Sequence, residues 1–321
     1  MEAYEPLAPI GHGSFGRVYK IKRKADGRVL VWKELNYGHM RDKEKHLVVS
    51  EVNILRELRH PFIVRYYDRI VEKHKTKIYI VMEYCEGGDV GALIKKHRRE
   101  GTRMEEEFIW RVFSQLLSAL KECHRHREAG GALRPILHRD IKPGNVFLDG
   151  HNNAKMGDFG LAKELPSQSK FAYTNVGTPF YMSPEMVNEM RYNEKSDIWA
   201  VGCLLYEMAA LRPPFEATNH LSLAVKINAG KFPRVPEPFS EDLNRAIRWM
   251  LNVEQAKRPT VEELERLPRV RGHLREATLN VKEYQMNHSY ALRVRELKLK
   301  DSELRHREAA LVAREQAVKG A

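Results

Sequence analysis

Two short segments within the first 84 residues have the pattern of β-strands. Residues 28–33 and 78–84 are rich in β-branched and aromatic side chains, which fit the pleated, half-buried surface of a strand. Between them, apolar side chains in residues 44–58 recur at helical spacing. The pattern predicts a small β-rich unit with one helix over residues 1–84.

After residue 85 the pattern becomes mainly helical. Three glutamates at 105–107 open a stretch whose apolar residues recur at helical spacing. Residues 200–206 are apolar nearly all round, which predicts a helix in the middle of a larger core. A proline-punctuated loop at 233–240 and capping-box spacing at 260–263 follow. We expect a second, larger helical unit over residues 85–268.

The last segment, residues 269–321, is a highly charged helix by pattern. Its apolar residues repeat every seven positions, as in a coiled coil, at Leu297, Leu304, Leu311 and Val318. The companion positions three residues earlier are mostly acidic: Val294, Asp301, Glu308 and Glu315. Only half of a coiled-coil seam is therefore apolar, and both an oligomerising helix and a solvated single helix fit this pattern.

Composition narrows the class of protein further. The chain has 321 residues, of which 42% are hydrophobic and 31% are charged, and its net charge is +12. The hydrophobic and charged fractions are typical of a folded protein and exclude a collagen-like or disordered chain. No apolar run reaches the roughly 18 residues that a membrane span needs, and the acidic amino terminus lacks a signal peptide. Three widely spaced cysteines support neither a disulfide framework nor a zinc site. We expect a protein of the cytoplasm, the nucleus or both, without a membrane segment.

Three glycines, Gly11, Gly13 and Gly16, have the spacing of a phosphate-binding loop. Glycines let backbone amides approach phosphate oxygens closely. An ordinary hairpin turn has the same spacing and is the better interpretation of such a motif alone. A strand follows the glycines instead of preceding them, which disfavours a dinucleotide-binding Rossmann site.

A lysine and a glutamate occupy apolar faces of the predicted elements. Lys33 shares its side of the strand with Val29, Val31 and Leu35, so its ammonium group needs an anionic partner. Glu51 lies on the apolar face of the predicted helix and can supply one. Separate side chains that each reach solvent are an equal alternative.

The strongest chemical signal is His-Arg-Asp-Ile-Lys-Pro-Gly-Asn at residues 138–145, followed by Asp-Phe-Gly at 158–160. Asp140 can accept a proton from an attacking hydroxyl group, and Lys142 can offset phosphate charge. Asn145 and Asp158 can supply oxygen ligands to a hard cation such as Mg²⁺. Polar loop caps alone do not explain this order of residues.

These motifs, in this order, resemble those of eukaryotic protein kinases over about residues 4–268. The phrases HPFIVRYYDRI, VGTPFYMSPE and YNEKSDIWAVGCLLYE further resemble the NIMA-related (never-in-mitosis A) serine/threonine kinases. The resemblance implies an α+β bilobal fold, with a small β-rich N-lobe, a large helical C-lobe and a charged C-terminal helix. It also implies transfer of the ATP γ-phosphoryl group to Ser or Thr of protein substrates, dependent on Mg²⁺, in mitotic or microtubule-linked control.

The resemblance also implies roles for individual residues. Lys33, held by Glu51, would contact the α- and β-phosphates, and Asp140 would be the catalytic base. Lys142 would steady the transferred phosphoryl group, while Asn145 and Asp158 would hold Mg²⁺. The residues implied to enclose the nucleotide are Ile10, Gly11, His12, Gly13, Ser14, Phe15, Gly16, Arg17, Val18, Val31, Met82, Glu83, Cys85 and Phe147.

Other positions follow from the same resemblance. Glu185 would pair with Arg258, and Asp197 would brace the catalytic loop. Gly144 stands where kinases that select arginine usually carry glutamate, so we expect weak demand for arginine upstream of the target residue. Thr174 and Thr178 are the expected sites of regulatory phosphorylation.

Two other functions remain alternatives at this point. A nucleic-acid binder is suggested by the positive charge and by the basic run at residues 95–99, although no reader motif accompanies that run. A catalytically silent scaffold could act through the C-terminal helix, and the same helix could form a homodimer.

Overall fold

A computed structural model of the chain describes residues 2–13, 16–38, 40, 52, 55–127, 130–158 and 180–319. The chain divides into two compact units, Met1–Ala277 and Thr278–Ala321, which are described separately below.

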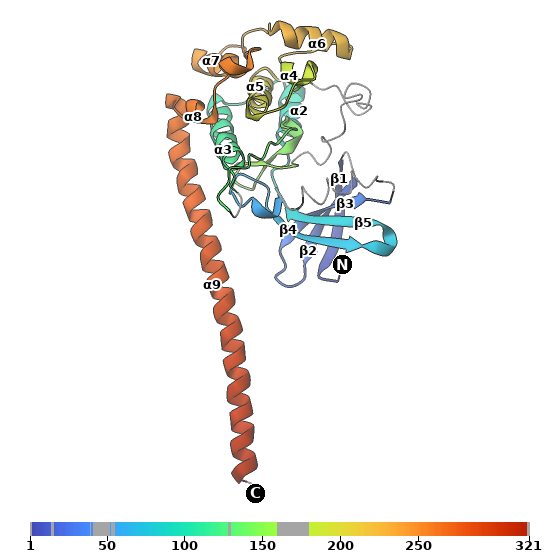
Figure 1. Ribbon diagram of the computed structural model, residues 1–321, viewed down its shortest axis with the longest axis vertical. Helices are drawn as coiled ribbons and strands as arrows, with labels where there is room; N and C mark the ends of the chain where they lie inside the picture. Colours follow the sequence, from blue (N-terminus) through green and yellow to red (C-terminus); the bar gives the residue numbers. More distant parts are fainter. Residues whose placement is uncertain are drawn as a thin grey trace. The chain divides into compact units, whose positions relative to one another are not determined.

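The N-lobe is a five-stranded antiparallel sheet with the order β1-β2-β3-β5-β4 (Figure 1). Its strands are β1 (Tyr4–Gly13), β2 (Gly16–Arg23), β3 (Val29–Asn36), β4 (Tyr66–Glu72) and β5 (Lys77–Glu83). The strands predicted at 28–33 and 78–84 are confirmed as β3 and β5. The apolar pattern does not reveal β1, because most of its described side chains face solvent.

Both faces of β3 are covered, which explains its nearly continuous apolar sequence. On one face Trp32 packs against Tyr79, with ring centroids 5.1 Å apart, in a cluster with other buried residues of the sheet. On the other face Leu35 packs with Val52 and Ile80. Val52 belongs to the helix predicted at 44–58, of which residues 52 and 55–58 are described. Residues 52 and 55–57 are helical, and Leu58 lies beyond the end of the helix.

The C-lobe is built from helices around one buried helix. Its helices are α2 (Val90–Glu100), α3 (Glu106–His124), α4 (Pro184–Val187), α5 (Glu194–Ala210), α6 (His220–Ala229), α7 (Glu241–Met250) and α8 (Val261–Leu264). Residues 196–209 of α5 are all buried, as the apolar run at 200–206 predicts. Two short paired strands, β6 (Val146–Leu148) and β7 (Ala154–Met156), follow the motif at 138–145.

The C-lobe is followed by α9 (Pro268–Lys319). The predicted capping box forms at the start of α8, where the Thr260 hydroxyl and the Glu263 carboxylate accept each other's backbone N–H at 3.2 and 2.7 Å. The first turns of α9 belong to the unit Met1–Ala277. There Val270 is buried and His273 lies 3.2 Å from Glu107 of α3.

The unit Thr278–Ala321 contains the rest of α9. Two positions of its seven-residue repeat, Leu297 and Leu304, are 60% and 57% exposed. Their apolar surface is therefore not covered within one chain. Among the described residues, no helix is both long and apolar enough to cross a membrane.

Candidate active site

The catalytic-loop residues Asp140, Lys142 and Asn145 converge on one carboxylate oxygen. Lys142 Nζ donates to Asp140 Oδ2 at 2.8 Å, and Asn145 Nδ2 donates to the same atom at 2.9 Å. Asn145 Nδ2 also donates to the Asp140 carbonyl oxygen at 2.8 Å. The turn Pro143–Asn145 is a short 3-10 helix that begins with proline, and it brings Asn145 back toward Asp140. These contacts fix the orientation of the Asp140 side chain.

A buried aspartate holds the start of this loop. Asp197, at the beginning of α5, is 0% exposed and accepts the backbone N–H groups of His138 and Arg139, each at 3.1 Å. His124 Nε2, 2.9 Å away, and the Tyr192 hydroxyl also contact its carboxylate. Burial raises the pKa of Asp197, but the His124 hydrogen bond and neighbouring charges outweigh burial and lower it. Asp197 therefore stays ionised and supports Arg139, whose φ of +67° lies in the left-handed region.

His138 links the catalytic loop to the residue that precedes Asp158. Its Nδ1 accepts the Asp140 backbone N–H at 3.3 Å, and its Nε2 lies 3.1 Å from the Gly157 carbonyl oxygen. Burial lowers the pKa of His138, so the ring is neutral and donates from Nε2. The Gly157 N–H also donates to the Asn145 carbonyl oxygen at 3.0 Å.

His138 and Gly157 were not among the predicted site residues. A Cβ at Gly157 would lie 2.7 Å from Val64 Cγ2 and 3.0 Å from the Phe147 ring, so a larger residue there would require these side chains to move. The only signal in the sequence was the position of His138 at the start of the motif.

Lys33 of β3 forms an ion pair with Asp158. Lys33 is 4% exposed, and Val31 and Leu35 on the same side of β3 are buried with it, although Val29 is exposed. The predicted need for an anionic partner is met here by a carboxylate of the C-lobe. Glu51, the partner expected from the sequence, lies outside the described residues.

The three glycines lie where β1 and β2 meet. Gly11 pairs with Val18, His12 with Arg17, and Gly13 with Gly16. The motif is thus the end of an antiparallel hairpin, with the expected site residues Ser14 and Phe15 outside the described part. A Cβ at Gly16 would overlap with the Glu34 carbonyl oxygen on β3, so this position requires glycine. Ile10, another expected site residue, lies exposed on β1.

The expected adenine-binding residues come from adjacent elements. Val31 of β3 pairs with Met82 of β5, and Phe147 lies on β6. The Glu83 backbone N–H donates to the Arg65 carbonyl oxygen at 2.8 Å. Of the two backbone polar groups of Glu83, the carbonyl oxygen is therefore the one left to bond to a base. Burial raises the pKa of the half-buried Cys85 thiol to about 12, so this thiol is neutral at physiological pH.

A buried ion pair that the sequence did not reveal lies behind this segment. Lys155 Nζ of β7 is 3.0 Å from Glu83 Oε1 and donates to the Pro61 carbonyl oxygen at 2.7 Å. The pair joins the end of β5 to the C-lobe. No alternation of apolar and polar residues singles out Lys155 in the sequence, because β7 is only three residues long.

The donor set fits a hard cation with few protein ligands. Asn145 uses its amide nitrogen on Asp140, which leaves the amide oxygen as a ligand, and Asp158 supplies a carboxylate. Among the described residues, no group of three His, Cys, Asp or Glu side chains could hold a metal ion. A cation here would thus take its other ligands from water and phosphate oxygens, as Mg²⁺ does.

A second buried ion pair stabilises the C-lobe below the site. Arg258 donates to both carboxylate oxygens of Glu185 at 2.7 Å, and the Ser196 hydroxyl donates to one of them at 2.5 Å. Burial raises the pKa of Glu185, but the hydrogen bonds from Arg258 and Ser196 outweigh burial and lower it to about 2. This is the pairing that the family resemblance implies.

A buried lysine on a strand, a loop in which Asp, Lys and Asn side chains meet, and a two-lobed fold together define a protein kinase. A family model described as the protein kinase domain matches residues 4–268. Serine/threonine-protein kinase Nek2 of Homo sapiens is 52% identical over 318 residues, which cover 97% of this chain and 71% of the relative. G2-specific protein kinase nimA of Emericella nidulans is 44% identical over 298 residues, 87% of this chain and 42% of that relative.

The chain therefore belongs to the NIMA-related serine/threonine protein kinases. It is an enzyme that phosphorylates serine and threonine residues of protein substrates, with ATP and a divalent metal ion. Thr174 and Thr178 lie outside the described residues, and their regulatory phosphorylation stays a prediction.

Proposed function

We propose that Asp140 is the base that accepts the proton of the substrate hydroxyl group. The observation that supports this role best is that Lys142 and Asn145 both donate hydrogen bonds to Asp140 Oδ2, at 2.8 and 2.9 Å. A carboxylate fixed in this way is positioned before the substrate arrives. Lys142 lies close enough to offset the charge of the transferred phosphoryl group as well. Replacement of Asp140 by asparagine, which cannot accept this proton, tests the role.

We further propose that Mg²⁺ is the metal, held by Asn145 and Asp158. A bound Mg²⁺ supplies positive charge that neutralises phosphate oxygens. Lys33 would contact the α- and β-phosphates, and its present ion pair with Asp158 keeps the buried Lys33 ammonium group paired with a partly exposed carboxylate in the protein without nucleotide.

We propose a role in cell-cycle control, exerted in the cytoplasm or the nucleus. The support is the name of the Emericella nidulans relative, a G2-specific protein kinase, at 44% identity. The chain spans 42% of the length of that relative. A cell-cycle role for this chain, with its substrates and its timing, is therefore a proposal that the shared kinase domain supports.

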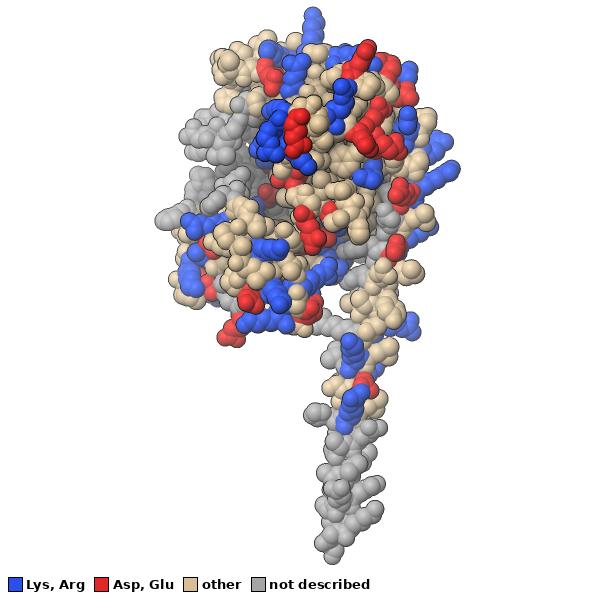
Figure 2. Space-filling view, turned by 180° about the vertical axis from the view of Figure 1, so that it is seen from behind, with Lys and Arg blue, Asp and Glu red and all other residues tan. Residues whose placement is uncertain are grey.

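Nucleic-acid binding receives less support than phosphoryl transfer. The basic run at residues 95–99 forms the last turns of α2, where positive charge is favourable next to the helix dipole. Within it, Arg98 donates to the Leu211 carbonyl oxygen and Arg99 lies 3.6 Å from Glu100. On the face shown in Figure 2, Lys and Arg alternate with Asp and Glu and do not form a continuous basic stripe.

We propose that α9 forms a parallel homodimer beyond Thr278. By helical register, each apolar position of the repeat lies between an acidic column, Asp301, Glu308 and Glu315, and a basic column, Lys300, Arg307 and Arg314. In a parallel pair the basic column of one helix would lie beside the acidic column of the other. This charge complementarity compensates for the missing apolar positions.

The dimer predicts a change of mass in solution. Replacement of Leu297 and Leu304 by aspartate in the full chain should halve the mass measured by light scattering, because both side chains would lie in the seam. Ser302→Asp adds one negative charge away from the seam, as each leucine substitution adds one within it, and should leave the mass unchanged. A wild-type chain that is monomeric at 50 µM, or a dimer that survives both substitutions, would contradict the proposal.

Target selection gives another prediction. A Cβ at Gly144 would meet no atom within 4 Å, so a larger side chain can be accommodated there. Gly144→Glu should add a carboxylate near Asp140 and raise kcat/KM for peptides with arginine upstream of the target serine by about tenfold, the effect of one charge-assisted hydrogen bond. Gly144→Gln is the uncharged control. Equal gains for both variants would show that charge is not the cause.

A further inference from the structure

The buried ion pair between Lys155 and Glu83 takes no part in the phosphoryl transfer proposed above. Lys155 is 6% exposed, and burial of an ammonium group is costly unless an anion and hydrogen-bond acceptors surround it. Its Nζ lies 3.0 Å from Glu83 Oε1 and donates to the Pro61 carbonyl oxygen at 2.7 Å. Lys155 therefore joins two segments that are far from it in the sequence.

Residues 61–65, which precede β4, run beside β7 of the C-lobe. The Met156 N–H donates to the Phe62 carbonyl oxygen at 2.8 Å, and the Val64 N–H donates to the Met156 carbonyl oxygen at 2.9 Å. Between these two bonds, Ile63 and Met156 form a parallel bridge. Backbone hydrogen bonds therefore attach this loop to the C-lobe.

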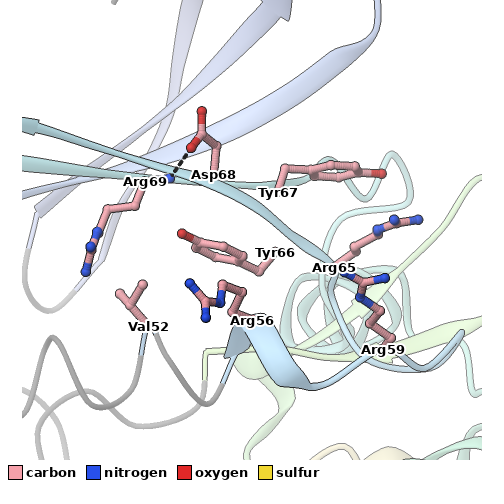
Figure 3. A pocket seen from close by; sticks show the side chains of 8 residues that line it. All are labelled: Val52, Arg56, Arg59, Arg65, Tyr66, Tyr67, Asp68 and Arg69. Atoms are coloured by element: carbon pink, nitrogen blue, oxygen red, sulfur yellow. Dashed lines mark hydrogen bonds between the residues drawn. The ribbon is translucent and has the colours of Figure 1, made fainter. Parts of the chain in front are cut away.

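Arg65, the last residue before β4, contacts Glu83 through its backbone. The Glu83 N–H donates to the Arg65 carbonyl oxygen at 2.8 Å, and the Arg65 N–H donates to Glu83 Oε2 at 3.1 Å. The Arg65 side chain is directed away from the Tyr66 ring (Figure 3), and its guanidinium group lies 5.1 Å from the centre of the Tyr67 ring. The two oxygens of the Glu83 carboxylate thus have different partners, Lys155 and the Arg65 backbone.

These contacts form a closed ring of hydrogen bonds. The ring runs from β7 through residues 61–65 to Glu83, and returns to β7 at Lys155. The Glu83 side chain is 20% exposed, so without Lys155 its charged carboxylate would turn toward water. That movement would also release the Arg65 N–H and leave the Pro61 carbonyl oxygen without this donor. Lys155 therefore keeps the end of β5 in a fixed position.

A neighbouring histidine does not replace Lys155 as the cation beside Glu83. Burial and the charge of Lys155 lower the pKa of His60 to about 4, so its ring is neutral at physiological pH. His60 Nδ1 accepts the Phe62 N–H at 3.2 Å, and His60 Nε2 lies 3.2 Å from Ser118 Oγ. The ring is thus used in holding the loop.

The ion pair lies between two residues that are expected to contact adenine. Phe147 of β6, expected beneath the base, pairs directly with Lys155 of β7. The Glu83 carbonyl oxygen is the backbone group left to bond to the base, because the Glu83 N–H is used on Arg65. The pair therefore sets the position of the acceptor relative to the surface beneath the base.

We propose that Lys155 is a positioning residue for ATP binding, which acts through Glu83 to place the carbonyl oxygen that bonds to adenine. Neither residue is among those expected to contact the phosphates, the metal ion or the substrate hydroxyl group, so the effect is confined to the base. The proposal rests on the nucleotide site expected for a protein kinase, and it does not depend on the roles proposed for Asp140 and Mg²⁺.

The test compares the binding of three probes to the full chain by titration calorimetry. ATP has both the base and the phosphates, adenosine has the base alone, and tripolyphosphate has the phosphates alone; Mg²⁺ is added with the two phosphate probes. Lys155→Met keeps the length of the side chain and removes its charge. It should weaken binding of ATP and adenosine by the same factor, about three- to tenfold, as for one hydrogen bond between uncharged groups. Its affinity for tripolyphosphate should equal that of the wild type.

Steady-state kinetics gives a second readout for the same variant. The KM for ATP should rise by the factor seen in binding, while kcat at saturating ATP should stay at the wild-type value, because the reacting groups are not displaced. A residue that only stabilises the fold would lower the thermal unfolding midpoint without this separation of KM from kcat.

Glu83→Gln tests whether Lys155 acts through Glu83. A single amide oxygen cannot accept from both Lys155 and the Arg65 N–H, so this variant should weaken adenosine binding about as much as Lys155→Met. The double variant should be no weaker than either single variant, since both remove the same contact.

Lys121→Met is the matched control, because Lys121 pairs with Glu265 on the surface of the C-lobe at 2.7 Å. It should bind all three probes as the wild type does. The thermal unfolding midpoint establishes that each variant is folded. If Lys155→Met does not fold, Lys155→Gln takes its place, with a smaller loss expected because it keeps a donor.

Three results would overturn the proposal. One is an unchanged affinity of the folded Lys155 variant for adenosine. Another is equal weakening of all three probes, which would show a general loosening of the nucleotide site. The third is a loss in the double variant equal to the product of the two single losses, because Lys155 would then act independently of Glu83. A wild-type chain that binds tripolyphosphate but not adenosine would contradict the expected base site and this proposal together, and would leave the prediction for Asp140→Asn intact.

Discussion

Asp140→Asn is expected to lower the rate of phosphoryl transfer by about 10²–10⁴-fold, the usual contribution of a general base. Asparagine has the size of aspartate but cannot accept a proton from the substrate hydroxyl group. It can still accept hydrogen bonds from Lys142 and Asn145 through its amide oxygen, so the loop should keep its conformation. The rate is measured as transfer of labelled phosphate to a protein substrate in the presence of Mg²⁺. The ATP affinity and the thermal unfolding midpoint of the variant are measured as well.

Asp242→Asn is the matched control, because Asp242 is exposed and pairs only with Arg245 three residues later among the described residues. Its activity should equal that of the wild type. A variant at position 140 that is folded, binds ATP and keeps more than a tenth of the activity would show that Asp140 is not the base.

Arg258→Met is expected to destabilise the protein by about 3–5 kcal/mol, the typical cost of removing one partner of a buried ion pair. Glu185 is 4% exposed and would be left charged without its bidentate partner. The backbone carbonyls of Asn252 and Lys195 would also lose a donor, at 2.6 and 3.1 Å in the wild type. Urea unfolding followed by circular dichroism measures the loss.

The pH dependence of stability gives an independent readout of the same pair. The folded-state pKa of Glu185 is about 2, below its ordinary value of 4.5. Its contribution to stability is therefore fully present above pH 4.5 and is lost as the pH falls toward 2. Arg258→Met should remove this dependence, since the carboxylate no longer gains from being ionised.

Arg245→Met is the control for Arg258, because its ion pair with Asp242 is exposed and should contribute at most about 1 kcal/mol. A double variant, Glu185→Leu with Arg258→Met, should recover part of the stability lost in the single variant. If the two arginine variants lost equal amounts, burial of the Glu185 pair would not be important for stability.

The elements that the sequence predicted are those with an uninterrupted or nearly uninterrupted apolar stretch. Helix α5 was predicted because it is buried on all sides, and β3 and β5 because their apolar residues are contiguous. The strand β1 escaped prediction because its exposed side chains have no apolar alternation, although backbone pairing with β2 holds it in the sheet.

The candidate site was predictable where a motif carries the chemistry within one loop, as at Asp140, Lys142 and Asn145. Partners far apart in the sequence were harder to assign. Lys33 needs an anion by its position on β3, but the pattern alone could not show that Asp158 meets it in this conformation.

The carboxylate of Asp197 has a further consequence for how this enzyme can change over time. It connects the end of α3, the first residues of the catalytic loop and the start of α5, so displacement of any one of these segments would break hydrogen bonds to this carboxylate. Substitutions in exposed loops of the C-lobe can then accumulate without displacing Asp140. New substrate preferences can arise at the periphery while the geometry of the chemical step stays constant.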